Sequence, residues 1–102
     1  MLRAAKSANF SGYFASPLRY PGGKGRLGPW LASVIEKNDL RGGWYVEPFA
    51  GGAGAALYLL LEGHVEHIVI NDADPLIHAF WQSVVCETAA FADMIRRTPV
   101  TM

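Results

Sequence analysis

The sequence Trp-Tyr-Val-Glu-Pro-Phe-Ala-Gly-Gly-Ala-Gly-Ala, residues 44–55, decides the fold of this chain. Its aromatic and β-branched beginning is typical of a short buried strand, which ends at Glu47-Pro48. A glycine-rich turn follows, and residues 55–62 are strong helix formers that end at Gly63. A strand, a glycine turn and a helix in this order indicate a parallel α/β unit.

The pattern continues on both sides of this stretch. Helices are predicted where apolar residues recur three and four positions apart, and a strand is predicted where β-branched residues run together. The further predicted elements are a helix from Leu27 to Asn38, a strand over 67–71, a helix that begins at Pro75 and a helix over 89–97. The resulting βαβα unit implies a parallel sheet with a right-handed crossover.

The chain is predicted to divide into a lead-in and one domain. Residues 1–16 show no hydrophobic period and are expected to be flexible, whereas residues 17–102 form an α/β domain. Two strands are too few for a parallel sheet, which needs several neighbours and cover on both faces. We therefore expect the front part of a larger domain, in which Ile68–Ile70 lie beside an open edge unless further strands come from elsewhere.

Composition restricts the class of protein. Hydrophobic residues make up 51% of the 102 residues and charged residues 18%, so the chain is expected to fold around a core. No apolar run is long enough for a membrane span and no signal peptide is recognisable, which favours a cytoplasmic location. The single cysteine, Cys86, cannot form an internal disulfide and is expected to be buried. The histidines lack metal-ligand spacing, so no metal is expected.

Charge is unevenly distributed along the chain, although the formal net charge is zero. Most of the basic residues lie in the first 41 positions, whereas most of the acidic residues lie beyond them. A basic beginning before an acidic body suits a polyanion or a carboxylate ligand, and an ordinary solvated surface is the alternative.

The glycine-rich turn carries the first candidate site. Glycines between a strand and a helix let the backbone approach a ligand closely, and the first N–H groups of the helix point at that ligand. Asp72 follows the second strand, 18 residues after Gly54. This is near the spacing at which a Rossmann-type unit presents a carboxylate to ribose hydroxyls. These residues predict an adenosine-containing cofactor, and a tight turn without a ligand is the alternative.

Glu47 discriminates between cofactors of this kind. A carboxylate at the end of the strand repels a pyrophosphate, whereas it attracts the ammonium group of S-adenosyl-L-methionine. Glu47 and Asp72 together therefore favour S-adenosyl-L-methionine over NAD. The alternative is that Glu47 is an ordinary surface acid at the end of a strand.

A second candidate site precedes the first predicted helix and reads Tyr-Pro-Gly-Gly-Lys, residues 20–24. Lys24 follows paired glycines and can reach a carboxylate or a phosphate, and Tyr20 offers an aromatic face for stacking. The segment is not a P-loop, because it lacks the preceding strand and the Ser or Thr after the lysine. A turn with a solvated lysine is the alternative.

Residues 17–24, 45–54 and 70–75 together resemble the opening of the Dam-like (D12 class) DNA adenine-N6 methyltransferases. The resemblance implies a partial Rossmann-like methyltransferase fold, S-adenosyl-L-methionine as cofactor and double-stranded DNA as substrate. It also implies that the Pro-Gly-Gly-Lys and Glu-Pro-Phe segments hold the methionine part of the cofactor, and that the acid after the second strand binds its ribose. The cofactor-binding residues implied in this way are Tyr20, Lys24, Glu47, Phe49, Gly51, Gly54 and Asp72.

One motif of that family is absent. The Asp-Pro-Pro-Tyr-type motif, which holds the adenine amino group, does not occur, because none of the six prolines adjoins another. No catalytic residue is therefore assigned, and the chain is expected to be a truncated, inactive N-terminal portion of a methyltransferase. The first alternative is a non-catalytic cofactor- or DNA-binding remnant that pairs with a second chain supplying the missing strands. The second is a fragment of a nicotinamide-dependent oxidoreductase, which Glu47 disfavours.

Overall fold

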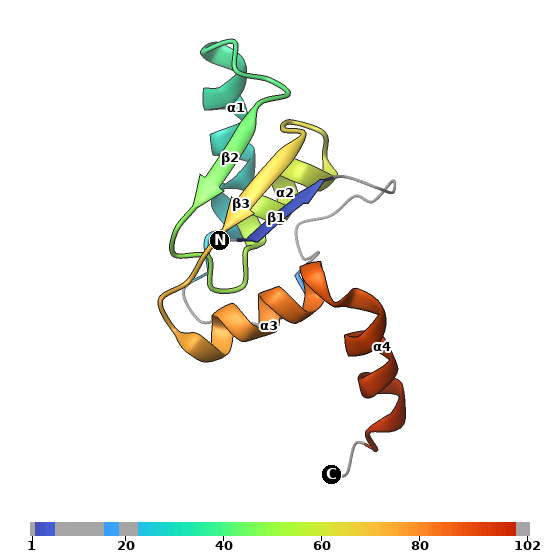
Figure 1. Ribbon diagram of the computed structural model, residues 1–102. Coiled ribbons are helices and arrows are strands. Elements are labelled where there is room, and N and C mark those ends of the chain that lie inside the picture. Colours follow the sequence, from blue (N-terminus) through green and yellow to red (C-terminus); the bar gives the residue numbers. More distant parts are fainter. Residues whose placement is uncertain (1, 6–15, 19–22, 100–102) are drawn as a thin grey trace.

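The computed structural model of the chain describes residues 2–5, 16–18 and 23–99 (Figure 1). Its elements in chain order are β1 (Leu2–Ala5), the short 3-10 helix η1 (Gly25–Leu27), α1 (Gly28–Lys37), β2 (Trp44–Glu47), α2 (Gly54–Leu61), β3 (His67–Ile70), α3 (Pro75–Cys86) and α4 (Thr88–Arg97). Every helix and strand predicted between residues 27 and 97 is confirmed, close to its expected ends.

Local chemistry explains where the helices begin and end. Pro29 lies in the first turn of α1, and Asn38 ends that helix. Gly63 follows α2 with a φ of 80°, a left-handed conformation that glycine adopts without strain. Asp74 caps α3, because its Oδ1 accepts a hydrogen bond from the Leu76 amide at 2.9 Å.

The strands form one sheet in the order β1-β3-β2. β2 and β3 are parallel, with Trp44 opposite His67 and Glu47 opposite Ile70, and α2 connects the two strands. The predicted parallel βαβ unit is thus confirmed. β1 runs antiparallel to β3, so a strand forms within residues 1–16, for which the sequence predicts no element.

The open edge of the sheet differs from the prediction. β3 is the central strand, with β1 on one side and β2 on the other, so the expectation that Ile68–Ile70 lie beside an open edge is wrong. Among the described strands, β2 has a neighbour on one side only. The sequence pattern misses this because β1 pairs with residues far along the chain, and such pairing leaves no local signal.

The core lies between α2 and one face of the sheet (Figure 1). Leu59 of α2 is fully buried, as are Ile68 and Ile70 of β3, and α1 packs against α2. The opposite face of β2 is open, because Trp44 is 54% exposed and Val46 is 53% exposed. The parallel register places Glu47 on the same side as Ile70, toward the core.

α3 and α4 extend from the sheet as a pair of connected helices (Figure 1). α3 contacts β1, and the Phe91 ring of α4 lies edge-on to Phe80 of α3 with 5.8 Å between ring centroids. Trp81 of α3 is 3% exposed and belongs to the core. Cys86 is exposed at the end of α3, so its expected burial is wrong. No helix in the described part of the chain is long and apolar enough to cross a bilayer.

The close approach of α1 and α2 generates a prediction about Gly28. A Cβ atom at this position would lie 2.5 Å from Cδ1 of Tyr58, so an added methyl group must displace the ring or separate the helices. Gly28→Ala is therefore expected to lower the free energy of unfolding by about 1–3 kcal/mol, measured by chemical denaturation. Ser33→Ala is the control, because the Ser33 hydroxyl donates a hydrogen bond to the Trp30 carbonyl oxygen within the same helix, and its loss should change stability by less than about 0.5 kcal/mol. Equal stability of the two variants would contradict the prediction.

Candidate cofactor site

The loop over residues 48–53 turns sharply where β2 ends. Gly51 and Ala53 both have positive φ values, 51° and 52°. Glycine takes this conformation freely, whereas it costs an alanine about 1–2 kcal/mol. Gly54 begins α2, and a Cβ atom there would lie 3.1 Å from Cα of Gly25, so glycine lets α2 approach η1 closely. The left-handed backbone conformation of Ala53 is thus unfavourable by itself, so contacts with the rest of the fold hold the loop in place.

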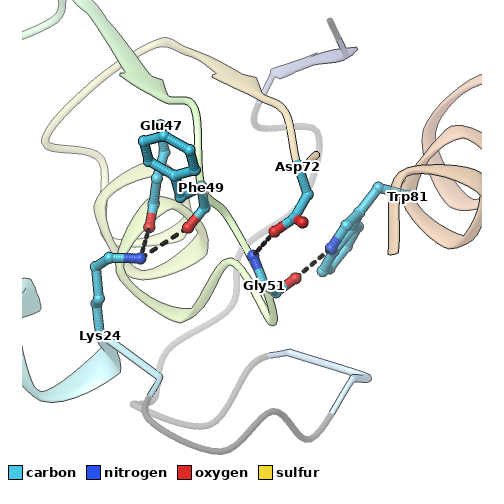
Figure 2. A network of polar contacts seen from close by, with 6 residues as sticks. All are labelled: Lys24, Glu47, Phe49, Gly51, Asp72 and Trp81. Carbon is cyan, nitrogen blue, oxygen red and sulfur yellow. Dashed lines mark hydrogen bonds and ion pairs between the residues drawn. The ribbon is translucent and has the colours of Figure 1, made fainter. Parts of the chain in front are cut away.

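A lysine and a glutamate meet beside this loop (Figure 2). Lys24 Nζ lies 3.2 Å from Glu47 Oε1 and donates a hydrogen bond to the Phe49 carbonyl oxygen at 2.8 Å. The Lys24 side chain is 44% exposed, whereas that of Glu47 is only 5% exposed. Solvent therefore reaches the ion pair mainly from the lysine side.

The carboxylate of Glu47 is buried without a well-formed hydrogen bond among the described residues. Burial raises the pKa of Glu47, and the nearby ammonium of Lys24 offsets part of the rise; the Ala56 amide and the Tyr45 hydroxyl lower it further. Burial and the Glu47 charge in turn raise the pKa of Tyr45 to about 12. A buried carboxylate whose neighbouring donors form no well-aligned hydrogen bond is a candidate ligand-binding group.

Asp72 joins the loop to the beginning of α3. Its Oδ1 accepts a hydrogen bond from the Asp74 amide and its Oδ2 accepts one from the Gly51 amide, both at 2.9 Å. These bonds, that of Asp74 first, lower the pKa of Asp72 because they favour the ionised carboxylate. The side chain is partly exposed, and each of its oxygens retains a second acceptor position.

Two residues outside the predicted set also hold the loop. Trp81 Nε1 donates a hydrogen bond to the Gly51 carbonyl oxygen at 2.7 Å, and the Ser16 hydroxyl donates one to the Gly52 carbonyl oxygen. Neither Trp81 nor Ser16 is among the residues predicted from the sequence to bind the cofactor. A signal existed for Trp81, since a buried indole N–H needs an acceptor. No sequence signal marked Ser16.

Most of the predicted cofactor residues come together in the structure. Those that lie around the loop in Figure 2 are Lys24, Glu47, Phe49, Gly51 and Asp72. Gly54 follows directly as the first residue of α2, and Phe49 is 70% exposed. Tyr20 lies outside the described residues. Over residues 2–5, 16–18 and 23–99, no three His, Cys, Asp or Glu side chains gather as a metal site.

Comparison with known proteins identifies the family. Searches of curated proteins and of solved structures found no match to the chain. The family model for the D12 class N6 adenine-specific DNA methyltransferase matches residues 20–100, a span that includes Lys24, Glu47 and Asp72. Because this span is most of the chain, the protein belongs to the D12 class of N6 adenine-specific DNA methyltransferases.

Proposed function

We propose that this chain is the cofactor-binding portion of an S-adenosyl-L-methionine-dependent DNA adenine-N6 methyltransferase. The observation that carries the proposal is the buried carboxylate of Glu47, which has an ion pair with Lys24 but no well-formed hydrogen bond among the described residues. Burial of such a group is unfavourable unless donors compensate it. Its position beside a glycine loop, in a chain of this family, supports a cationic ligand group as the further donor.

The charges of Lys24 and Glu47 match the amino-acid end of the cofactor, which carries an α-ammonium and an α-carboxylate. Glu47 would accept hydrogen bonds from the ammonium, and Lys24 would donate to the carboxylate. One internal ion pair is then exchanged for two ion pairs with the ligand. Because Lys24 is 44% exposed, its side chain can turn toward a ligand without crossing the core.

Asp72 is proposed to bind the ribose, as the family resemblance implies. Each of its oxygens already accepts one amide hydrogen bond and has a second acceptor position for a ribose hydroxyl. The lowered pKa of Asp72 keeps the carboxylate ionised, which strengthens hydrogen bonds of this type. The exposed side chain of Phe49 adds apolar surface beside the loop. These residues bind and orient the cofactor, which supplies a methyl group on a positively charged sulfonium.

The target adenine of double-stranded DNA requires residues that this chain does not contain. The Asp-Pro-Pro-Tyr-type motif is not among the 102 residues. We propose that this motif comes from elsewhere in the same protein or from a second chain. β2 has a free side within the described sheet, where a further strand fits. These residues alone are therefore expected to be inactive.

A titration of the ¹⁵N-labelled chain with S-adenosyl-L-methionine, followed by NMR, tests the proposed site. Amide shifts are expected at Lys24, Glu47, residues 49–54 and Asp72, and NAD at the same concentration should leave these amides unshifted because Glu47 repels its pyrophosphate. The absence of shifts at these amides with millimolar cofactor would contradict the site, and equal shifts with NAD would contradict the cofactor.

The same titration gives the affinity, which is expected to be weaker than micromolar. The free edge of β2 leaves the strand that carries Glu47 without a neighbour on one side, so the site is less fixed than a completed one. Calorimetry provides an independent value. A low-micromolar dissociation constant for the chain alone would show that the site is already complete.

Glu47→Gln is expected to make the folded chain more stable at neutral pH. Folding raises the pKa of Glu47, so the folded state holds this proton more tightly, and stability is lost as the pH rises above about 4. A glutamine at this position does not ionise, so the variant does not lose stability in this way. The difference in the free energy of unfolding between variant and unmodified chain should therefore grow with pH and level off above the folded pKa, as measured by urea denaturation at a series of pH values.

Glu36→Gln is the matched control for Glu47→Gln, because Glu36 is exposed on α1. The free energy of unfolding of this control variant should differ little from that of the unmodified chain across the same pH range. If Glu47→Gln instead loses stability as the pH rises, the carboxylate is well compensated without a ligand, and the argument for a cationic ligand group fails.

Asp72→Ala and Asp74→Ala separate the ribose site from helix capping in a complete enzyme. Asp72→Ala removes charge-assisted hydrogen bonds worth roughly 1.5–3 kcal/mol, so the dissociation constant for S-adenosyl-L-methionine should rise by about one to two decades. Asp74→Ala removes the cap of α3, which costs about 1 kcal/mol of stability but leaves affinity nearly intact. Dissociation constants that change alike, or that change more for Asp74→Ala, would place the ribose elsewhere.

A further inference from the structure

We propose that Trp81 is a positioning residue, which fixes the orientation of the peptide between Gly51 and Gly52 in the glycine loop. The identity of the ligand that the loop binds rests on the proposed function. The effect of Trp81 on the loop can be tested without any ligand. Figure 2 shows the indole of Trp81 aimed at the loop from α3, with Lys24 and Glu47 on the other side of Gly51.

Both backbone polar groups of Gly51 are held by side chains from outside the loop. The amide donates to Asp72 Oδ2 at 2.9 Å, and the carbonyl oxygen accepts from Trp81 Nε1 at 2.7 Å. Glycine populates both signs of φ readily, so the sequence of the loop does not by itself select the φ of 51° found here. The two side chains supply that selection, and Trp81, at 3% exposure, does so from a site that water does not share.

The orientation of the peptide between Gly51 and Gly52 determines the direction in which the Gly52 N–H points. The carbonyl and the N–H of a trans peptide point in opposite directions, and the chain has no cis peptide among the described residues. With the Gly51 carbonyl held toward α3, the Gly52 N–H therefore points away from α3. Gly52 is buried and this N–H makes no backbone hydrogen bond within the described residues, so the orientation of the peptide decides whether a ligand near the beginning of α2 can accept from it.

The position of Trp81 is itself set by the turn that carries Asp72. The Asp74 amide donates to Asp72 Oδ1, and the Asp74 side chain caps α3 through the Leu76 amide, both at 2.9 Å. The beginning of α3 is thus fixed to Asp72, and Trp81 in the same helix returns to the loop. Asp72, in the turn before α3, and Trp81, within α3, therefore hold Gly51 from two places.

Amide hydrogen exchange of the whole chain, followed by NMR, tests the proposal with Trp81→Phe, which keeps an aromatic ring but removes the donor. The amides of Gly51 and Ala53 bond to Asp72 and to the Ala50 carbonyl, not to Trp81, so their exchange reports the order of the loop. They are expected to exchange about tenfold faster in the variant, while the amides of Ile68–Ile70 keep their rates. Trp30→Phe is the matched control, because Trp30 is 62% exposed on α1.

Unchanged protection at Gly51 and Ala53 would overturn the proposal. So would an equal acceleration at Ile68–Ile70, because Trp81 would then stabilise the fold as a whole. A measurement on the unmodified chain tests the proposal even if Trp81→Phe does not fold. In this chain the indole N–H of Trp81 should exchange at least about tenfold more slowly than that of Trp30. Equal indole rates would also overturn the proposal.

Cofactor affinity separates this proposal from the proposed function. Where the unmodified chain binds S-adenosyl-L-methionine, Trp81→Phe should raise the dissociation constant about tenfold, and Trp30→Phe should leave it within about twofold. An unchanged constant for Trp81→Phe would overturn the positioning role. If the unmodified chain shows no binding, the proposed function fails, and the exchange rates still decide whether Trp81 orders the loop.

Discussion

The carboxylate of Glu47 is buried where β2 ends, and the ammonium of Lys24, 3.2 Å away, is the charge that compensates it. A carboxylate in this position without a counter-charge would be strongly destabilising. The ion pair joins Lys24, the residue before η1, to the last residue of β2. Near this ion pair, Gly28 leaves room for the Tyr58 ring and Gly54 leaves room for the backbone of Gly25. One electrostatic requirement thus connects the site with the packing of the helices behind it.

The local elements could be predicted because their signals are local. Helical spacing of apolar residues, Pro29 and Pro75 in first turns, and Gly63 after α2 each depend on a few neighbouring residues. The pairing of β1 with β3 joins segments about sixty residues apart and has no such signal, so the sequence leaves Leu2–Ala5 without structure and misplaces the free edge of the sheet. The positive φ of Ala53 was equally hidden, because alanine does not usually mark that conformation.

The candidate site was predictable as a set of charges but not as a set of contacts. The sequence identifies Lys24, Glu47 and Asp72 separately from their positions beside glycines and strand ends. It does not indicate that Lys24 pairs with Glu47, nor that both oxygens of Asp72 accept hydrogen bonds from backbone amides. Trp81 shows the same limit, since hydrophobicity predicts its burial but does not identify the carbonyl that accepts its N–H. Such contacts depend on how α3 lies against the loop, which only the folded chain defines.

β2 belongs both to the edge of the sheet and to the candidate site. Glu47 is the last residue of this strand, and the strand has a hydrogen-bonded neighbour on one side only within the described sheet. Its outer face carries Trp44 and Val46, each more than half exposed. An edge of this kind, with apolar side chains on one face, is rarely left uncovered in a stable α/β protein. A strand added along β2 would hydrogen-bond to the backbone that positions Glu47, so it would order the carboxylate. Completion of the sheet and the order of the candidate cofactor site are therefore physically coupled through β2, the strand that ends at Glu47.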